Sequence, residues 1–217
     1  MTSFARYYTD NRLYDFSMSD IKLLITDEVN KEKLADIIYN RYYSRYLKLF
    51  YFTTPNKKQY TQTVEGRDIV KELNEYNTEF KSGFAIMTNC CLLIETIATY
   101  FEGQNASTKS GTETFNIIFR KANDYQNDLK KFENKAFYKN IRCGLLHQGE
   151  TYGKFRIRRT GVLFDETNFV INANLFCDKL NDFLKSYREE LKMAKWDSEL
   201  WDKCRVKLRH IIQNSNF

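Results

Sequence analysis

Residues 84–101 read FAIMTNCCLLIETIATYF and form the most hydrophobic stretch of the chain. Asn89 and Glu95 interrupt it, whereas a helix that spans a membrane needs about 20 predominantly apolar residues with few or no charges. The stretch therefore predicts a buried helix, over residues 81–101, and not a membrane span. Because buried carboxylates are rarely left without a partner, Glu95 either faces Arg142 or points to solvent.

Outward from this stretch, helical and strand patterns cover most of the chain. Apolar residues at helical spacing predict helices over residues 27–52, 64–77, 112–122, 127–148, 173–191 and 198–213. Asn172 is suited to cap the helix that follows it. Alternating residues predict strands over 154–158 and 162–164 around Thr160-Gly161, with 169–171 as a candidate third strand.

The predicted fold class is mainly α: a helical bundle with a small β-hairpin insertion after the helix over residues 127–148. We divide the chain into an N-terminal helical extension, residues 1–80, with no assigned function, and a helical domain, residues 81–217. The hairpin lies near residues 154–171 of that domain. A chain of 217 residues can bury a core without disulfides or metal ions as staples.

The net charge and the cysteine pattern indicate which partners and which cell compartment to expect. The formal net charge of +6 at pH 7 favours polyanions as partners, although many soluble proteins are equally basic. The five cysteines show no metal-finger spacing, and the first residues lack the apolar core of a signal peptide. We expect a cytoplasmic protein in a reducing compartment, with no membrane span, no metal and no cofactor.

An arginine and a scarce histidine stand near the end of the helix predicted over residues 127–148. His147, one of two histidines in the chain, follows Arg142 by five residues. Positions five apart on an α-helix differ in direction by about 140°. The pair is therefore expected to meet through the reach of the arginine, through fraying near Gly149, or across a twofold axis from a second copy.

The chemistry that such a pair suits is phosphoryl transfer within RNA. A histidine can take the proton of a ribose 2′-hydroxyl or give one to the leaving 5′-oxygen. A guanidinium can stabilise the charge that builds on the phosphorane. Neither step requires a metal ion.

Two other interpretations of these residues stay open. Cys143 and His147 are four residues apart, a spacing that could suit a metal ion or a thiol nucleophile with its base. His147 also falls on the extrapolated helical face of Phe132 and Ala136, which is the pattern of a core histidine.

A basic strand follows the motif. On the strand predicted over residues 154–158, Lys154, Arg156 and Arg158 share one face, while Phe155 and Ile157 share the other. These three cations form either a surface that binds phosphates next to His147 or an ordinary solvated strand face.

Arg142, four intervening residues and His147 resemble the signature of the HEPN (higher eukaryotes and prokaryotes nucleotide-binding) superfamily, in which His follows Arg after four to six residues. The longer run R-C-G-L-L-H-Q-G-E, residues 142–150, with the basic hairpin after it, is similar to a little-characterised bacterial branch. The resemblance covers about residues 81–191.

This resemblance implies a homodimeric helical bundle in which two Arg/His motifs meet at the interface. It implies a metal-independent endoribonuclease of a toxin–antitoxin or antiphage defence system, with Arg142 and His147 as catalytic pair and an antitoxin or another protein as partner. Active members commonly carry a polar residue directly after the arginine; here Cys143 stands there, and Asn140 could substitute. The alternative is a non-catalytic dimer that binds RNA, nucleotides or proteins.

Overall fold

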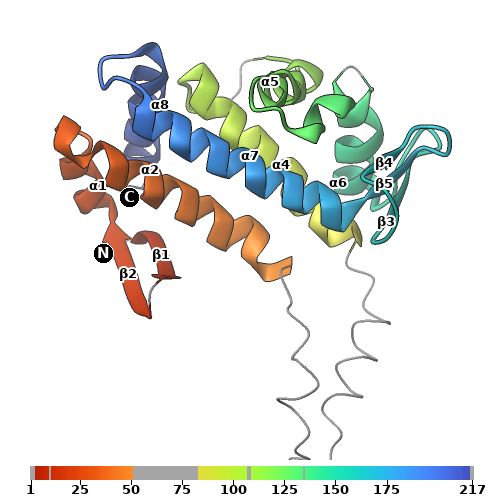
Figure 1. The fold of residues 1–217 in the computed structure, drawn as a ribbon, viewed down its shortest axis with the longest axis horizontal. Helices are drawn as coiled ribbons and strands as arrows, with labels where there is room; N and C mark the ends of the chain where they lie inside the picture. Colours follow the sequence, from red (N-terminus) through yellow and green to blue (C-terminus); the bar gives the residue numbers. More distant parts are fainter. Residues whose placement is uncertain (1–2, 10, 51–82, 107–108, 134, 216–217) are drawn as a thin grey trace, which may run out of the picture.

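Helices make up most of the computed structural model, which describes residues 3–9, 11–50, 83–106, 109–133 and 135–215 (Figure 1). Its α-helices are α1 (Met18–Leu24), α2 (Lys31–Tyr42), α4 (Gly83–Glu102), α5 (Gly111–Asp124), α6 (Gly144–Gln148), α7 (Ala173–Met193) and α8 (Glu199–Gln213). Its strands are β1 (Ser3–Thr9), β2 (Arg12–Ser17), β3 (Arg156–Arg158), β4 (Phe164–Asp165) and β5 (Val170–Asn172). The mainly α fold class is thus confirmed, and the helix predicted over residues 64–77 lies outside the described residues.

Helices α4 and α7 pack against each other and form the centre of the bundle. Helices α5 and α8 also pack on α4, and α2 lies beside α7 (Figure 1). The ring of Tyr187 on α7 lies 4.9 Å from the ring of Phe101 and 6.4 Å from that of Tyr100, both on α4. Asn172 caps α7 as predicted, because its side chain accepts hydrogen bonds from two first-turn amides.

Helix α4 is long and apolar enough, by length and composition, to cross a membrane. Of its most apolar 18-residue window, 56% is buried within the bundle. A mostly buried core helix of a soluble protein passes the same test, so this feature is weak evidence for a membrane span.

The N-terminal segment begins with strands, and the prediction that residues 1–80 form a helical extension is wrong for its first part. Strands β1 and β2 pair as an antiparallel hairpin. Aromatic residues face each other across it: the rings of Tyr7 and Tyr14 stack with their centroids 5.5 Å apart. Cross-strand aromatic pairs stabilise a two-stranded sheet, and this short-range pattern was missed in the sequence.

Two arginines join this hairpin to the helices. Arg41 and Arg45 both donate hydrogen bonds to the carbonyl of Phe4 in β1, and the guanidinium of Arg41 lies 4.1 Å from the centre of the Phe4 ring. Helix α2 packs on β1 as well as on α7, and its buried residues belong to the same hydrophobic core as those of the later helices. The described part of residues 1–80 is therefore integral to the fold and is not an appendage.

The small sheet after α6 has a different strand order from the predicted hairpin. Strand β5 lies in the centre, parallel to β3 and antiparallel to β4, so β3 and β4 do not pair with each other. The residues of β5 are all buried, whereas Arg156 and Arg158 of β3 are exposed. The apolar strand takes the central position, and the cationic strand forms an edge, where charged side chains discourage pairing with another chain.

Candidate active site around Arg142 and His147

The motif segment is not the continuous α-helix predicted over residues 127–148. A 3-10 helix, η4 (Asp128–Phe132), comes first, and Ala136 then adopts a left-handed conformation with φ 54°. A π-helical segment, η5 (Tyr138–Cys143), follows and runs directly into α6. A π-helix closes hydrogen bonds between residues five apart, so its wider turn changes which side chains share a face.

This irregular turn brings Arg142 and His147 together within one chain. Nη1 of Arg142 lies 3.4 Å from Nε2 of His147. The contact forms within one chain, which is one of the routes expected from the sequence, and the segment is not the regular α-helix for which a 140° separation was calculated. A guanidinium only donates hydrogen bonds, so Nε2 of His147 can take part in this contact only as the acceptor.

The loop after α6 folds back onto the π-helical segment and holds its shape. Gly149 ends α6 in a left-handed conformation, with φ 69°. The amide of Tyr152 then donates to the carbonyl of Asn140 at 2.8 Å. A Cβ atom on Gly144 would overlap the carbonyl oxygen of Glu150, so only glycine permits this close approach.

Asn140, expected as a supporting residue, contacts this returning loop. A Cβ atom on Gly153 would come within 2.8 Å of the side-chain oxygen of Asn140. In the described structure, no hydrogen bond joins the Asn140 side chain to Arg142 or His147. In this structure Asn140 contributes its carbonyl to the turn, and its expected role as a supporting residue of the site stays a prediction.

Glu95 faces Arg142, which settles the alternative left open by the sequence. Its Oε1 accepts from Nε of Arg142 at 2.8 Å, and its Oε2 accepts from Nη2 at 3.3 Å. The side chains of Arg142 and Glu95 are 20% and 26% exposed. Burial opposes the charge of Arg142, but the hydrogen bonds and charge of Glu95 outweigh it and raise the pKa of Arg142.

Tyr138 is a site residue to which the sequence analysis assigned no role. Its ring centre lies 5.5 Å from the guanidinium carbon of Arg142, four residues later. Burial and a hydrogen bond with Cys143 raise the pKa of the Tyr138 hydroxyl. The ring lies directly on Gly111 at the start of α5, where any Cβ atom would overlap it. The aromatic–cation spacing of four residues was the available signal.

His147 is exposed, and the core-histidine interpretation is wrong. Phe132 is 1% exposed, but Ala136 is exposed and adopts a left-handed conformation, so no regular helix continues from Phe132 to His147. The helical face extrapolated from Phe132 to His147 therefore does not exist. The imidazole of His147 is accessible to solvent and can exchange protons with a bound substrate.

Cys143 is half-buried and forms a hydrogen bond with Tyr138. A metal site that used Cys143 and His147 would need further ligands. Across the described residues, no three or more His, Cys, Asp or Glu side chains are grouped as metal ligands would be.

Lys154, Arg156 and Arg158 are all exposed and Phe155 is buried, as predicted. The predicted strand over residues 154–158 is shorter in the structure, because β3 covers only residues 156–158 and Lys154 adopts a left-handed conformation with φ 70°. Ile157 packs against Gly83, which precedes Glu95 by twelve residues on α4. At about 1.5 Å per residue, the middle of β3 is offset from the Glu95–Arg142 level by roughly 18 Å along the helix. Lys154, Arg156 and Arg158 are called the cationic track below. The track extends away from the Arg142–His147 pair, and Lys154, which follows Gly153, is its member nearest to the motif turn.

A cavity of about 440 Å³ borders Glu95 and Tyr138. Leu92, Glu95 and Thr96 of α4 form one wall, and Tyr138 and Gly111 form another. Lys109 and Lys207 also border it. The cavity is within the size range of small-molecule sites, about 300–1,000 Å³.

Comparisons with known proteins identify no relative: no protein-family model, no curated protein and no solved structure matches the chain. The HEPN resemblance therefore stays a prediction that rests on the motif residues.

Proposed function

We propose that the protein is a metal-independent endoribonuclease in which Arg142 and His147 act on one phosphate. The observation that carries this proposal is the 3.4 Å distance between Nη1 of Arg142 and Nε2 of His147 at a solvent-exposed turn. One phosphodiester can contact both groups at that separation, with the guanidinium on a non-bridging oxygen and the imidazole beside a ribose hydroxyl.

The reaction is an internal transfer. Nε2 of His147 takes the proton of the 2′-hydroxyl, and the resulting oxygen attacks the adjacent phosphorus. The bond from phosphorus to the 5′-oxygen breaks, and that oxygen receives a proton. The products end in a 2′,3′-cyclic phosphate and a 5′-hydroxyl, so atoms and charge balance without a further reactant. Arg142 stabilises the extra negative charge on the phosphorane.

Glu95 is a positioning residue in this proposal. It occupies Nε and Nη2 of Arg142, so Nη1 is the part of the guanidinium that remains for His147 and a phosphate. Because Glu95 projects from the buried helix α4, the guanidinium is anchored to the rigid centre of the fold. A preoriented cation loses less entropy when the substrate binds.

A homodimer would complete the chemistry, because one step needs a base and the other an acid. Each chain has one His147, and a second copy would supply the other proton-transfer group. Leu92, one helical turn before Glu95 on α4, is 38% exposed and offers apolar surface beside the pair. No disulfide joins any of the five cysteines, all of which lie among the described residues, and this supports our placement of the protein in a reducing cytoplasm.

A second candidate function is a non-catalytic dimer that binds RNA, a nucleotide or a protein such as an antitoxin. Cys143 favours it, because that thiol contacts Tyr138 and supplies no polar group next to the arginine. Glu95 also neutralises much of the charge of Arg142.

One assay distinguishes the two candidate functions. Purified protein is incubated with a mixed RNA pool in EDTA, and cleavage is followed over time. We expect wild-type protein to cut and His147→Ala to cut roughly 10²–10⁴-fold more slowly, the usual size of a general acid–base contribution. RNA binding without cleavage by wild type would favour the non-catalytic dimer.

A further inference from the structure

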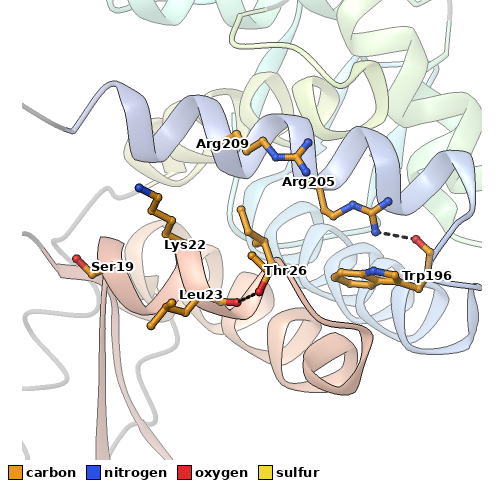
Figure 2. A pocket seen from close by; sticks show the side chains of 8 residues that line it. Ser19, Lys22, Leu23, Thr26, Trp196, Arg205 and Arg209 are labelled. Carbon is orange, nitrogen blue, oxygen red and sulfur yellow. Dashed lines mark hydrogen bonds between the residues drawn. The ribbon is translucent and has the colours of Figure 1, made fainter.

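A second, larger hollow lies at the opposite end of the bundle from the motif, between α1 and α8 (Figures 1 and 2). Its volume is about 920 Å³, at the upper end of the range of small-molecule sites. Lys22 and Leu23 of α1 border it on one side, and Arg205 and Arg209 of α8 border it on the other (Figure 2).

Two of its cations have no partner among the residues that the structure describes. Lys22 and Arg209 are exposed, and within the described structure neither forms an ion pair or a side-chain hydrogen bond. Arg205 differs, because it pairs with Asp202 and donates to the carbonyl of Trp196 at 2.7 Å. The hollow therefore has one fixed, neutralised cation and two whose charge is uncompensated.

The remaining wall is apolar. The guanidinium carbon of Arg205 lies 4.4 Å from the centre of the Trp196 ring, which keeps this half-buried indole in place. Leu23 is 71% exposed and Ile25 is buried at the base of α1. Leu23 and Trp196 border the hollow from opposite sides, with Thr26 between them (Figure 2). Apolar surface together with exposed cations is the composition of a site for a ligand with an apolar body and an anionic head.

We propose that this hollow binds a small phosphate monoester that carries an apolar group. At neutral pH a phosphate monoester has a charge of about −1.5 to −2, which matches the two uncompensated cations, Lys22 and Arg209. Its apolar group would cover Leu23 and Trp196 and remove their surface from water. This site is independent of the ribonuclease proposal, because it shares no residue with the Arg142–His147 turn.

Tryptophan fluorescence can report on ligand binding at this site, because Trp196 lines the hollow. The ring of Trp201, the other tryptophan of the chain, lies 4.8 Å from that of Trp196, centre to centre. Tryptophan emission is titrated with phenyl phosphate, n-hexyl phosphate and inorganic phosphate, and calorimetry measures each Kd. We expect either ester to shift the emission and to bind at least about 10-fold more tightly than inorganic phosphate, since burying a few methylene-sized groups is worth more than 1.4 kcal/mol. The tighter of the two esters tells whether the apolar group is a ring or an alkyl chain.

Lys22→Gln/Arg209→Gln should weaken ester binding about 10-fold or more, whereas Lys48→Gln/Lys130→Gln, which removes the same charge elsewhere, should leave it unchanged. His147→Ala should bind as wild type does. Equal losses in both double variants, equal affinity for inorganic phosphate, or no change in emission would each overturn the proposal. Because Lys22 and Arg209 are exposed, circular dichroism should show an unchanged fold in that variant.

Discussion

Glu95 holds Arg142 at two points, with Oε1 2.8 Å from Nε and Oε2 3.3 Å from Nη2. The contact joins the central helix α4 to an irregular turn that is 47 residues away in the sequence. It fixes the orientation of the guanidinium and leaves Nη1 beside His147. The carboxylate inside the most hydrophobic stretch of the chain is thus a structural support of the candidate site.

Glu95→Gln should therefore reduce RNA cleavage without abolishing it. The amide can accept one hydrogen bond from Arg142 but cannot hold it at two points with a charge, and misplacement of a catalytic group by about 1 Å can cost up to 10²-fold. We expect a fall of roughly 10-fold or more in kcat at unchanged RNA affinity, measured in single-turnover assays.

The matched control is Glu113→Gln, which breaks the surface ion pair with Arg120. Exposed pairs contribute about 0–1 kcal/mol, so this variant should keep both activity and stability. Equal cleavage by Glu95→Gln and wild type would show that Glu95 does not position Arg142 for catalysis.

The protein should be a dimer in solution. One His147 per chain supplies one proton-transfer group, and cleavage with release of a 5′-hydroxyl uses two. Light scattering at micromolar concentration should report about twice the 26.0 kDa chain mass. A monomer that still cleaves RNA at the same rate would mean that each chain holds a complete site.

The cationic track should contribute to RNA affinity through phosphate contacts. Replacing Lys154, Arg156 and Arg158 with Gln should lower the slope of log K against log salt by roughly 2, at about 0.7 for each phosphate contact on a single strand. Fluorescence anisotropy with a labelled single-stranded RNA over a salt series measures the slope.

A control with three other exposed cations removed, Lys48, Lys130 and Lys195 to Gln, separates local contacts from net charge. Its salt slope should stay near that of wild type. If both triple variants change the slope equally, β3 is an ordinary solvated strand face.

Much of this arrangement was predictable, because hydrophobic spacing reports burial. The apolar run predicted over residues 81–101 is α4, and the Asn172 cap and periodic residues located α7 to within two residues at its C-terminal end. The exposed cations and buried Phe155 of the strand region followed from alternation.

Other features depend on contacts that a sequence pattern does not contain. The π-helical turn exists because the loop after Gly149 packs onto Gly144 and donates to the carbonyl of Asn140, so a regular helix was the wrong template. The central place of β5 depends on its burial against the bundle and not on the turn at Gly161. Arg41 is buried because the Phe4 carbonyl and ring accept its guanidinium, and this contact with β1 is not contained in the helical spacing of residues 27–52.

Alkaline pH should destabilise the fold through its buried tyrosines. The hydroxyls of Tyr42 and Tyr100 lie 2.9 Å apart in the core, and burial raises the pKa of both above the ordinary value near 10. The folded state therefore keeps protons that the unfolded chain releases, so the stability is fully present below about pH 10 and falls as the pH rises above it.

Urea unfolding followed by circular dichroism from about pH 8 to pH 11 measures this slope, at most ~1.4 kcal/mol per pH unit for each tyrosine. Tyr42→Phe/Tyr100→Phe removes both hydroxyls together, leaves neither unpaired, and should flatten the fall. An identical slope in the double variant would assign the alkaline sensitivity to other groups.

The most direct test of the account is the chemistry of the cut ends. Wild-type protein, His147→Ala and Arg142→Ala are incubated with one defined RNA in EDTA, and the termini are identified by mass spectrometry. Transfer to the 2′-oxygen predicts 2′,3′-cyclic phosphate and 5′-hydroxyl ends from wild type, and rates roughly 10²–10⁴-fold lower in both variants. The melting temperature should be unchanged in His147→Ala, whose side chain is exposed. Products ending in 3′-hydroxyl and 5′-phosphate, or the same rate in all three proteins, would contradict the assignment of Arg142 and His147 as the catalytic pair.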